Sequence, residues 1–324
     1  MRTHQRLSAT VLAAVAAAAA LAGCSSAGNG TATAASALAP AQPAPTSTLV
    51  PHWPVTVTAA NGAVTIKGPP ERIVSLDPTA TEDLYAVGAG AQVVAVDQDS
   101  DFPPGVPATS LSGLTPDIDA IAKYNPSLVI AARNSNGLVS GLNRLGIPVL
   151  IEPGPATVAR VYDQIVQIGQ ATGHDNQAHE VVTNMREEIT DVVQQAGTKY
   201  QGLTAYWERS SGPYRSATSA TLVGHVMEMF GLKNIADGDG AAYPVLSGSE
   251  IAATRPQIIF LADNDPADGG QTPATVAARP GWAGIPAVRD HEIIGLNDDL
   301  ASGWGSRLPQ LFQEIASALK SFKS

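Results

Sequence analysis

Two stretches of this chain, 130 residues apart, follow one pattern. "IAKYNPSLVIAA" begins at Ile121 and "IAATRPQIIFLA" begins at Ile251, and in each an Ile-Ala pair leads through polar residues to a proline and an apolar run. A proline cannot continue the hydrogen-bond ladder of a helix, so each stretch predicts a helix that stops before the proline and a buried strand after it. Coincidence is the alternative, since short strings of this kind are common. The repeat favours two similar lobes that each contain this unit.

Strand-like and helix-like runs alternate around the first stretch. We predict strands at "RIVSL", "QVVAVD", "SLVIAA" and "PVLIEP", and helices at "TATEDLYAVGA", "TPDIDAIAKY" and "NGLVSGLNRLG". Thr115 is expected to cap the second of these helices, with Pro116 in its first turn. Further upstream, Asn61-Gly62 between two alternating runs predicts a hairpin. Strands that alternate with helices indicate a parallel sheet covered on both faces.

This alternation is interrupted once. From Thr157 to Ala196 the sequence offers no strand, and it predicts two helices, the longer at "DNQAHEVVTNMREEITDVVQQAG". Strands then return at "LTAYWE", "PQIIFLAD" and "EIIGL". We therefore predict an α/β protein with an N-terminal lobe at 51–156, an interlobe helical segment at 157–197 and a C-terminal lobe at 198–324.

The first 50 residues do not have the composition of a folded domain. A basic start and an alanine-rich apolar run end in "LAGC", which predicts a secretory signal at 1–23 and places Cys24 at the cleavage point. "LAGC" resembles the bacterial lipobox, and this implies that Cys24 carries a lipid anchor on the outer face of the cell membrane. The alternative is a soluble secreted protein with one free thiol. Residues 24–50 are almost entirely Ala, Ser, Thr, Gly and Pro, which predicts a flexible tether.

Charge and motifs argue against several classes of function. The chain has 19 Lys and Arg against 29 Asp and Glu, and without Arg2 and Arg6 it has 17 against 29, a formal net charge of −12. An acidic chain suits neither nucleic acid nor an anionic membrane surface as a partner. The sequence has no G-x-S-x-G motif, which would place a nucleophilic serine on a strand-to-helix turn, so nothing indicates an enzyme. Nothing indicates a cofactor either. The loops expected after the strands contain no His, which argues against a zinc or manganese site.

Ligands of open α/β sheets bind outside the carboxyl ends of the strands. The loops expected there are rich in aromatic and arginine side chains, although aromatic residues make up only 5% of the sequence. Such residues suit a pocket for an organic ligand, although a loop tryptophan can equally pack between lobes. We assign Trp282 to such a structural role. The predicted ligand contacts in these loops are Phe102, Arg133, Trp207, Arg209, Tyr214, Arg215, Asp299 and Trp304.

The order of the motifs resembles a known family. The hairpin, "PERIVSL", "LYAVGAG" and the later "GWAGIPAVRDHEIIGLN" are similar to segments of the periplasmic binding proteins that serve iron–siderophore, haem and cobalamin ABC importers. The resemblance implies two Rossmann-like lobes joined by a single long helix, with the ligand in the cleft between them. It also implies a monomer that delivers a small-molecule chelate to an ABC permease. A surface lipoprotein of the same fold without a transport role is the alternative.

Members of this family dock to the permease through one acidic residue in each lobe, seven residues before the proline of the repeated unit. Asp119 occupies that position in the first lobe. In the second lobe the position is Ser249, and Glu250 follows it. Local roles compete with docking, because Glu250 completes a capping box that starts at Ser247 and Asp119 complements a helix dipole.

The resemblance also bears on the ligand. Haem binders often have an iron-ligating tyrosine where this chain has Phe102, which has no oxygen. Cobalamin binders have tryptophans where this chain has Leu111 and Ala132, although Tyr243 keeps an aromatic in the second lobe and is added to the predicted contacts. A ferric siderophore is therefore favoured, with cobalamin or haem as the alternative. Arg133, Arg209 and Arg215 are the expected partners of an anionic chelate.

Overall fold

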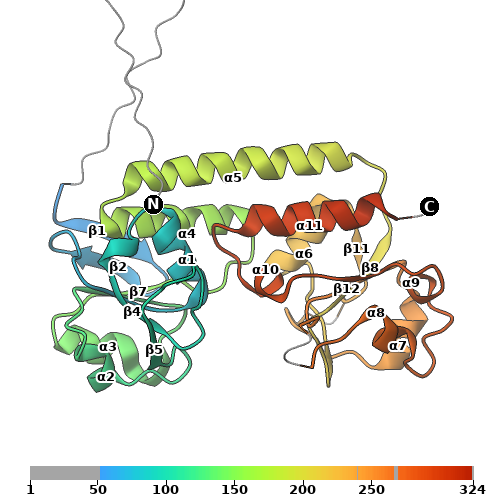
Figure 1. Cartoon of the computed structure of the whole chain (residues 1–324), viewed down its shortest axis with the longest axis horizontal. Helices are drawn as coiled ribbons and strands as arrows, with labels where there is room; N and C mark the ends of the chain where they lie inside the picture. The colour runs from blue at the N-terminus through green and yellow to red at the C-terminus, as the bar shows by residue number, and fades with distance from the viewer. Residues whose placement is uncertain (1–51, 239, 266–268, 323–324) are drawn as a thin grey trace, which may run out of the picture. The chain divides into compact units, whose positions relative to one another are not determined.

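Residues 52–238, 240–265 and 269–322 are described by a computed structural model of the protein (Figure 1). The predicted signal, Cys24 and tether lie outside these ranges. Within them, no helix is long and apolar enough to cross a bilayer. The strands are β1 (Val55–Ala59), β2 (Gly62–Ile66), β3 (Ile73–Leu76), β4 (Val93–Asp97), β5 (Ala108–Leu111), β6 (Leu128–Ala131), β7 (Val149–Ile151), β8 (Thr204–Glu208), β9 (Ser210–Ser211), β10 (Tyr214–Arg215), β11 (Lys233–Asn234), β12 (Ile258–Leu261) and β13 (Ile293–Gly295).

Helices connect most of these strands. The α-helices are α1 (Pro78–Ala86), α2 (Ile118–Ala122), α3 (Leu138–Arg144), α4 (Val158–Thr172), α5 (Asp175–Ala196), α6 (Leu222–Met229), α7 (Gly248–Thr254), α8 (Pro273–Ala277), α9 (Pro286–Arg289), α10 (Asp298–Ser302) and α11 (Leu308–Lys320). Two short 3-10 helices are η1 (Gly90–Gln92) and η2 (Ser135–Gly137).

Two parallel sheets organise the fold, as the alternating pattern predicts. Their strand orders are β5-β4-β3-β6-β7 and β11-β8-β12-β13. The repeated unit is confirmed, because α2 leads into β6 and α7 leads into β12, each strand lying inside its sheet. β5, β11 and the small hairpin β9–β10 were not predicted, because they are two to four residues long and lack an apolar run.

The predicted hairpin is present and is fastened to the first sheet. Ala59 pairs with Gly62, so the turn consists of Ala60 and Asn61. The Asn61 side chain donates to the carbonyl of Val149 at 2.9 Å and accepts from the Ile151 amide at 3.1 Å. These bonds satisfy backbone groups on edge strand β7, which would otherwise be open to another chain.

The start of α2 differs from the prediction. Asp117, not Thr115, is the N-cap, and its carboxylate accepts the Ala120 amide at 3.0 Å. Thr115 instead bonds through its own amide to the Ser112 hydroxyl. Both residue types cap helices well, so the sequence did not distinguish them.

The inner faces of the two sheets share one hydrophobic cluster. Successive strand residues face opposite sides of a sheet, and in both sheets one of these sides joins the same cluster. Ile130 contributes from β6, and Trp207 and Phe260 contribute from β8 and β12. Apolar residues of α4, α5 and α11 link these contributions into one cluster, and α5 packs against both α4 and α11 (Figure 1). The outer faces pack separately, with α2 and α3 on one sheet and α7 on the other.

The chain also connects the two sheet regions through the segment 303–307, between α10 and α11. The Ser306 amide donates to Asp83 Oδ1 at 2.7 Å. Arg307 forms an ion pair with Glu82, which precedes Asp83 on α1. Gly305 allows this approach, because a Cβ there would lie 2.4 Å from Asp83 Oδ1. Two connections, α5 and this segment, therefore fix the relative position of the strand ends.

Asp83 gives the stability of this connection a pH dependence. Its side chain is only 2% exposed, and burial raises its pKa from 3.8 to about 8. A raised folded-state pKa means that the folded protein binds the proton more tightly, so the stabilisation is complete below about pH 4 and is lost as the pH rises through about 8.

We predict that Asp83→Asn, which keeps the acceptor but cannot ionise, unfolds at a higher temperature than the wild type at pH 8.5. The difference should be about 2–4 °C for each kcal/mol of ionisation cost removed, and it should vanish near pH 4. Thermal denaturation followed by circular dichroism measures it. Asp191→Asn on the exposed side of α5 is the control, and an equal response of both variants would contradict the role of Asp83.

Candidate functional site

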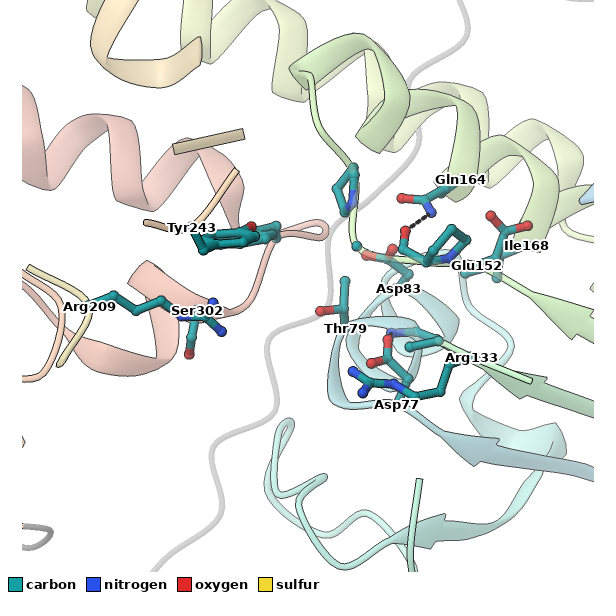
Figure 2. A pocket seen from close by; sticks show the side chains of 16 residues that line it. Asp77, Thr79, Asp83, Arg133, Glu152, Gln164, Ile168, Arg209, Tyr243 and Ser302 are labelled. Atoms are coloured by element: carbon teal, nitrogen blue, oxygen red, sulfur yellow. Dashed lines mark hydrogen bonds between the residues drawn. The ribbon is translucent and has the colours of Figure 1, made fainter. Parts of the chain in front are cut away.

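A pocket of about 420 Å³ lies where the carboxyl ends of the two sheets face each other (Figure 2). Residues one or two positions after the ends of β3, β6, β7 and β8 line it: Asp77, Arg133, Glu152 and Arg209. Carboxyl ends of parallel strands are the usual ligand site of such sheets, and here two sheets contribute. We call Asp77, Asp83, Arg133 and Glu152 the N-terminal wall, and Arg209, Tyr243, Ser302 and Trp304 the C-terminal wall.

Asp77 and Asp83 place two carboxyl groups on the N-terminal wall, both held by α1. Asp77 caps this helix by accepting the Ala80 amide at 3.0 Å. Burial raises the pKa of Asp77 to about 6, although Arg133 opposes the shift. Figure 2 shows Arg133 beside Asp77 and Asp83 further along the same wall.

Glu152 is the third carboxyl group of this wall. It is 5% exposed, its Oε2 accepts from Arg160 at 3.3 Å, and its Oε1 has no hydrogen-bond partner. Burial raises the pKa of Glu152 to about 7, while the charge of Arg160 and the side chain of Gln164 lower it. The neighbouring Gln164 amide donates to the Pro153 carbonyl at 2.6 Å. The wall therefore contains a buried carboxyl oxygen, Glu152 Oε1, that has no well-formed hydrogen bond, although the Gln164 amide lies close to this carboxyl group.

The C-terminal wall is built from a stacked cation and two aromatic rings. The Arg209 guanidinium lies 4.7 Å from the centre of the Tyr243 ring. Such stacking holds the guanidinium in place while its N–H groups remain able to donate. The Trp304 indole donates to the Ala301 carbonyl at 2.9 Å. Its ring also approaches Gly154 closely, because a Cβ added to Gly154 would lie 3.8 Å from Cζ3 of Trp304. Trp304 thus extends from one wall to the edge of the other.

The structure brings four of the nine predicted ligand contacts together in this pocket, namely Arg133, Arg209, Tyr243 and Trp304. Their contact with a ligand stays a prediction. The other five lie elsewhere.

Trp207 and Tyr214 are packed against other side chains. Trp207 is 1% exposed and lies 5.8 Å from Phe260, ring centre to ring centre, inside the shared cluster. It belongs to β8, so the loop starts two residues later than we expected. Tyr214 lies against Trp282, and the Arg279 guanidinium stacks on both rings. Trp282 therefore has the structural role that we predicted for it.

Phe102, Arg215 and Asp299 lie at the surface outside the pocket. Phe102 covers the guanidinium of Arg307 at 4.1 Å and lines a separate groove with α1, α5 and α11. Arg215 is in the exposed β9–β10 hairpin, and Asp299 lies in the first turn of α10, beside a different hollow.

Sequence reasoning missed Asp77, Asp83 and Glu152. Asp77 and Glu152 each come directly after a buried strand, which was a usable signal. An acid at such a position is most often a helix cap, as Asp77 is, so the residue type alone did not distinguish a pocket wall. Across the described ranges, no group of three or more His, Cys, Asp or Glu is arranged to hold a metal ion.

Comparisons with known proteins agree with this architecture. An uncharacterized ABC transporter substrate-binding lipoprotein of Bacillus subtilis is 29% identical over 276 residues, which cover 82% of this chain and 86% of the relative. A vitamin B12-binding protein of Pectobacterium carotovorum is 26% identical, over 77% of this chain and 88% of its own length. The crystal structure of the periplasmic vitamin B12-binding protein of Vibrio cholerae superposes with a TM-score of 0.66 at 25% identity, covering 78% of this chain and 97% of that one.

The family model described as periplasmic binding protein matches residues 73–300, from β3 to the middle of α10. This range contains both sheets and most of the pocket. The chain therefore belongs to the periplasmic binding protein family.

Proposed function

We propose that this protein is the substrate-binding component of an ABC importer, and that it captures an intact metal–organic complex, a ferric siderophore in the first place. The observation that supports this most is the pocket between the two strand-end walls, with Arg209, Tyr243 and Trp304 facing the N-terminal wall. A lipid on Cys24 would keep the protein at the membrane, and the similar protein of Bacillus subtilis is likewise named a lipoprotein.

A coordinatively complete chelate needs shape, aromatic surface and hydrogen bonds from its binder rather than metal ligands. The C-terminal wall offers these features. Arg209 can donate to the oxygen atoms of a chelate, and the Tyr243 and Trp304 rings can cover its apolar faces. Cobalamin is the second candidate, because the relatives from Pectobacterium and Vibrio are named as vitamin B12-binding proteins.

Binding should be visible in the fluorescence of Trp304, the tryptophan that lines the pocket. We predict that the true ligand, in a panel of ferric siderophores, haem and cyanocobalamin, quenches the wild type. Arg209→Ala should weaken binding roughly 10- to 100-fold, since a charge-assisted hydrogen bond contributes about 1.5–3 kcal/mol. Arg215→Ala, which changes an exposed arginine outside the pocket, is the matched control. If the two variants bind equally well, Arg209 is not a ligand contact.

The permease would meet the protein on the side opposite α5. In Figure 1, α2 and α7 lie on that side, one below each sheet. Asp119 and Glu250 are exposed on these helices. The capping box is present, with Glu250 Oε2 accepting the Ser247 amide at 2.6 Å, and this bond lowers the pKa of Glu250. The charge of Glu250 can therefore both complete the capping box and face a permease.

We predict that Asp119→Arg abolishes uptake of the ligand in cells while the dissociation constant of the purified protein stays unchanged. Glu250→Gln should reduce uptake without unfolding α7, because Gln also completes a capping box. Asp191→Arg on α5, far from this side, is the control. Transport at the normal rate in the Asp119→Arg strain would rule out the docking role.

A further inference from the structure

The N-terminal wall has a chemistry that the arginines alone do not suggest. Three carboxyl groups, from Asp77, Asp83 and Glu152, line it, against a single guanidinium, that of Arg133. Each carboxyl group accepts one hydrogen bond from the protein: Asp77 from the Ala80 amide, Asp83 from the Ser306 amide and Glu152 from the Arg160 guanidinium. The remaining oxygens of Asp77 and Glu152 are acceptors when these groups are ionised, since a carboxylate has about four lone-pair sites. Asp83, with a pKa raised to about 8, keeps its proton at neutral pH.

We propose, resting on the function proposed above, that the ligand directs hydrogen-bond donors, ammonium or amide N–H groups, to the N-terminal wall. Its substrate class is then a neutral or cationic metal complex that bears donors, and not a polyanionic chelate. This replaces the expectation that Arg133, Arg209 and Arg215 bind an anionic chelate.

Glu152 Oε1 is the atom that carries this inference. It is buried, it has no hydrogen bond of normal geometry, and its residue lines the pocket. Buried acceptors without a partner are rare because the cost of desolvation is not recovered, and those that persist need an explanation. A donor on the ligand recovers that cost at the moment of binding.

Charge repulsion supports the same orientation. An oxyanion of a chelate placed against this wall would face the charge of Asp77 above about pH 6 and that of Glu152 above about pH 7, in surroundings of low dielectric, where like charges repel strongly. Arg133 offsets only one of them, and Arg160 is already paired with Glu152. On the C-terminal wall, Arg209 has no such neighbours among the lining residues and suits the oxygen-rich side of the complex. The two walls together therefore orient the ligand.

The test compares probes that differ in charge and donors. Ferrioxamine B is a ferric tris-hydroxamate with a free ammonium group, N-acetyl-ferrioxamine B has the same chelate without that charge, ferric enterobactin is a trianionic tris-catecholate, and cyanocobalamin is neutral with several amide donors. Isothermal titration of the wild type with each gives four affinities. We expect ferrioxamine B, cyanocobalamin or both to bind, and ferric enterobactin to bind at least 100-fold more weakly than the better of the two.

Glu152→Gln then tests the atom itself. It should weaken the best donor-bearing probe at least tenfold. Asp163→Asn is the matched control, because Asp163 also lies near Arg160, at 3.9 Å, but is not part of the pocket lining. Thermal denaturation of both variants establishes that they are folded. The order of the four wild-type affinities tests the inference independently of either variant.

The outcomes separate the two proposals. Tightest binding of ferric enterobactin, or unchanged affinity in Glu152→Gln, overturns the inference while the function as a binder of metal complexes stands. If the wild type binds neither a probe of this panel nor haem, the proposed function fails and the inference falls with it.

Discussion

The hydrophobic cluster shared by the two sheets is the interaction on which the rest of the structure depends. Side chains from the inner faces of both sheets interdigitate with α4, α5 and α11, so neither sheet has a separate inner core. Protein interiors are packed as densely as organic crystals, and sliding one sheet against the other would disrupt that packing. The segment 303–307 adds a polar connection through Asp83, Glu82 and Arg307. The geometry of the pocket follows from these two constraints.

A pocket held in this way can be specific without much rearrangement. Residues fixed at strand ends and on helices keep their positions, so the ordering cost of binding is small. The polarity of the pocket differs between its two sides, with carboxyl groups on one wall and a stacked guanidinium with aromatic rings on the other. Such an arrangement selects both the charge of a ligand and its orientation.

Much of the fold could be predicted from the sequence, and the site only in part. Proline before an apolar run marked the start of β6 and β12 correctly, because a proline cannot continue a helix beyond its first turn. Trp207 could not be placed, because both faces of a buried parallel strand are apolar and the sequence does not mark where the strand ends. Glu152 was missed because only tertiary packing decides that its Oε1 has no partner. Phe102 follows a strand region but covers Arg307, a residue 205 positions later, and no local signal encodes that contact.

The most direct test of the central claim is an anomalous-difference map from crystals grown with the ligand that the titrations identify, measured at the absorption edge of its metal. The account predicts one strong peak between the two walls, with the donor groups of the ligand toward Glu152 and Asp77 and its oxygen-rich side toward Arg209 and Tyr243. A peak in the groove beside Phe102 and Arg307, or a ligand in the pocket with its anionic groups toward Glu152, would contradict it.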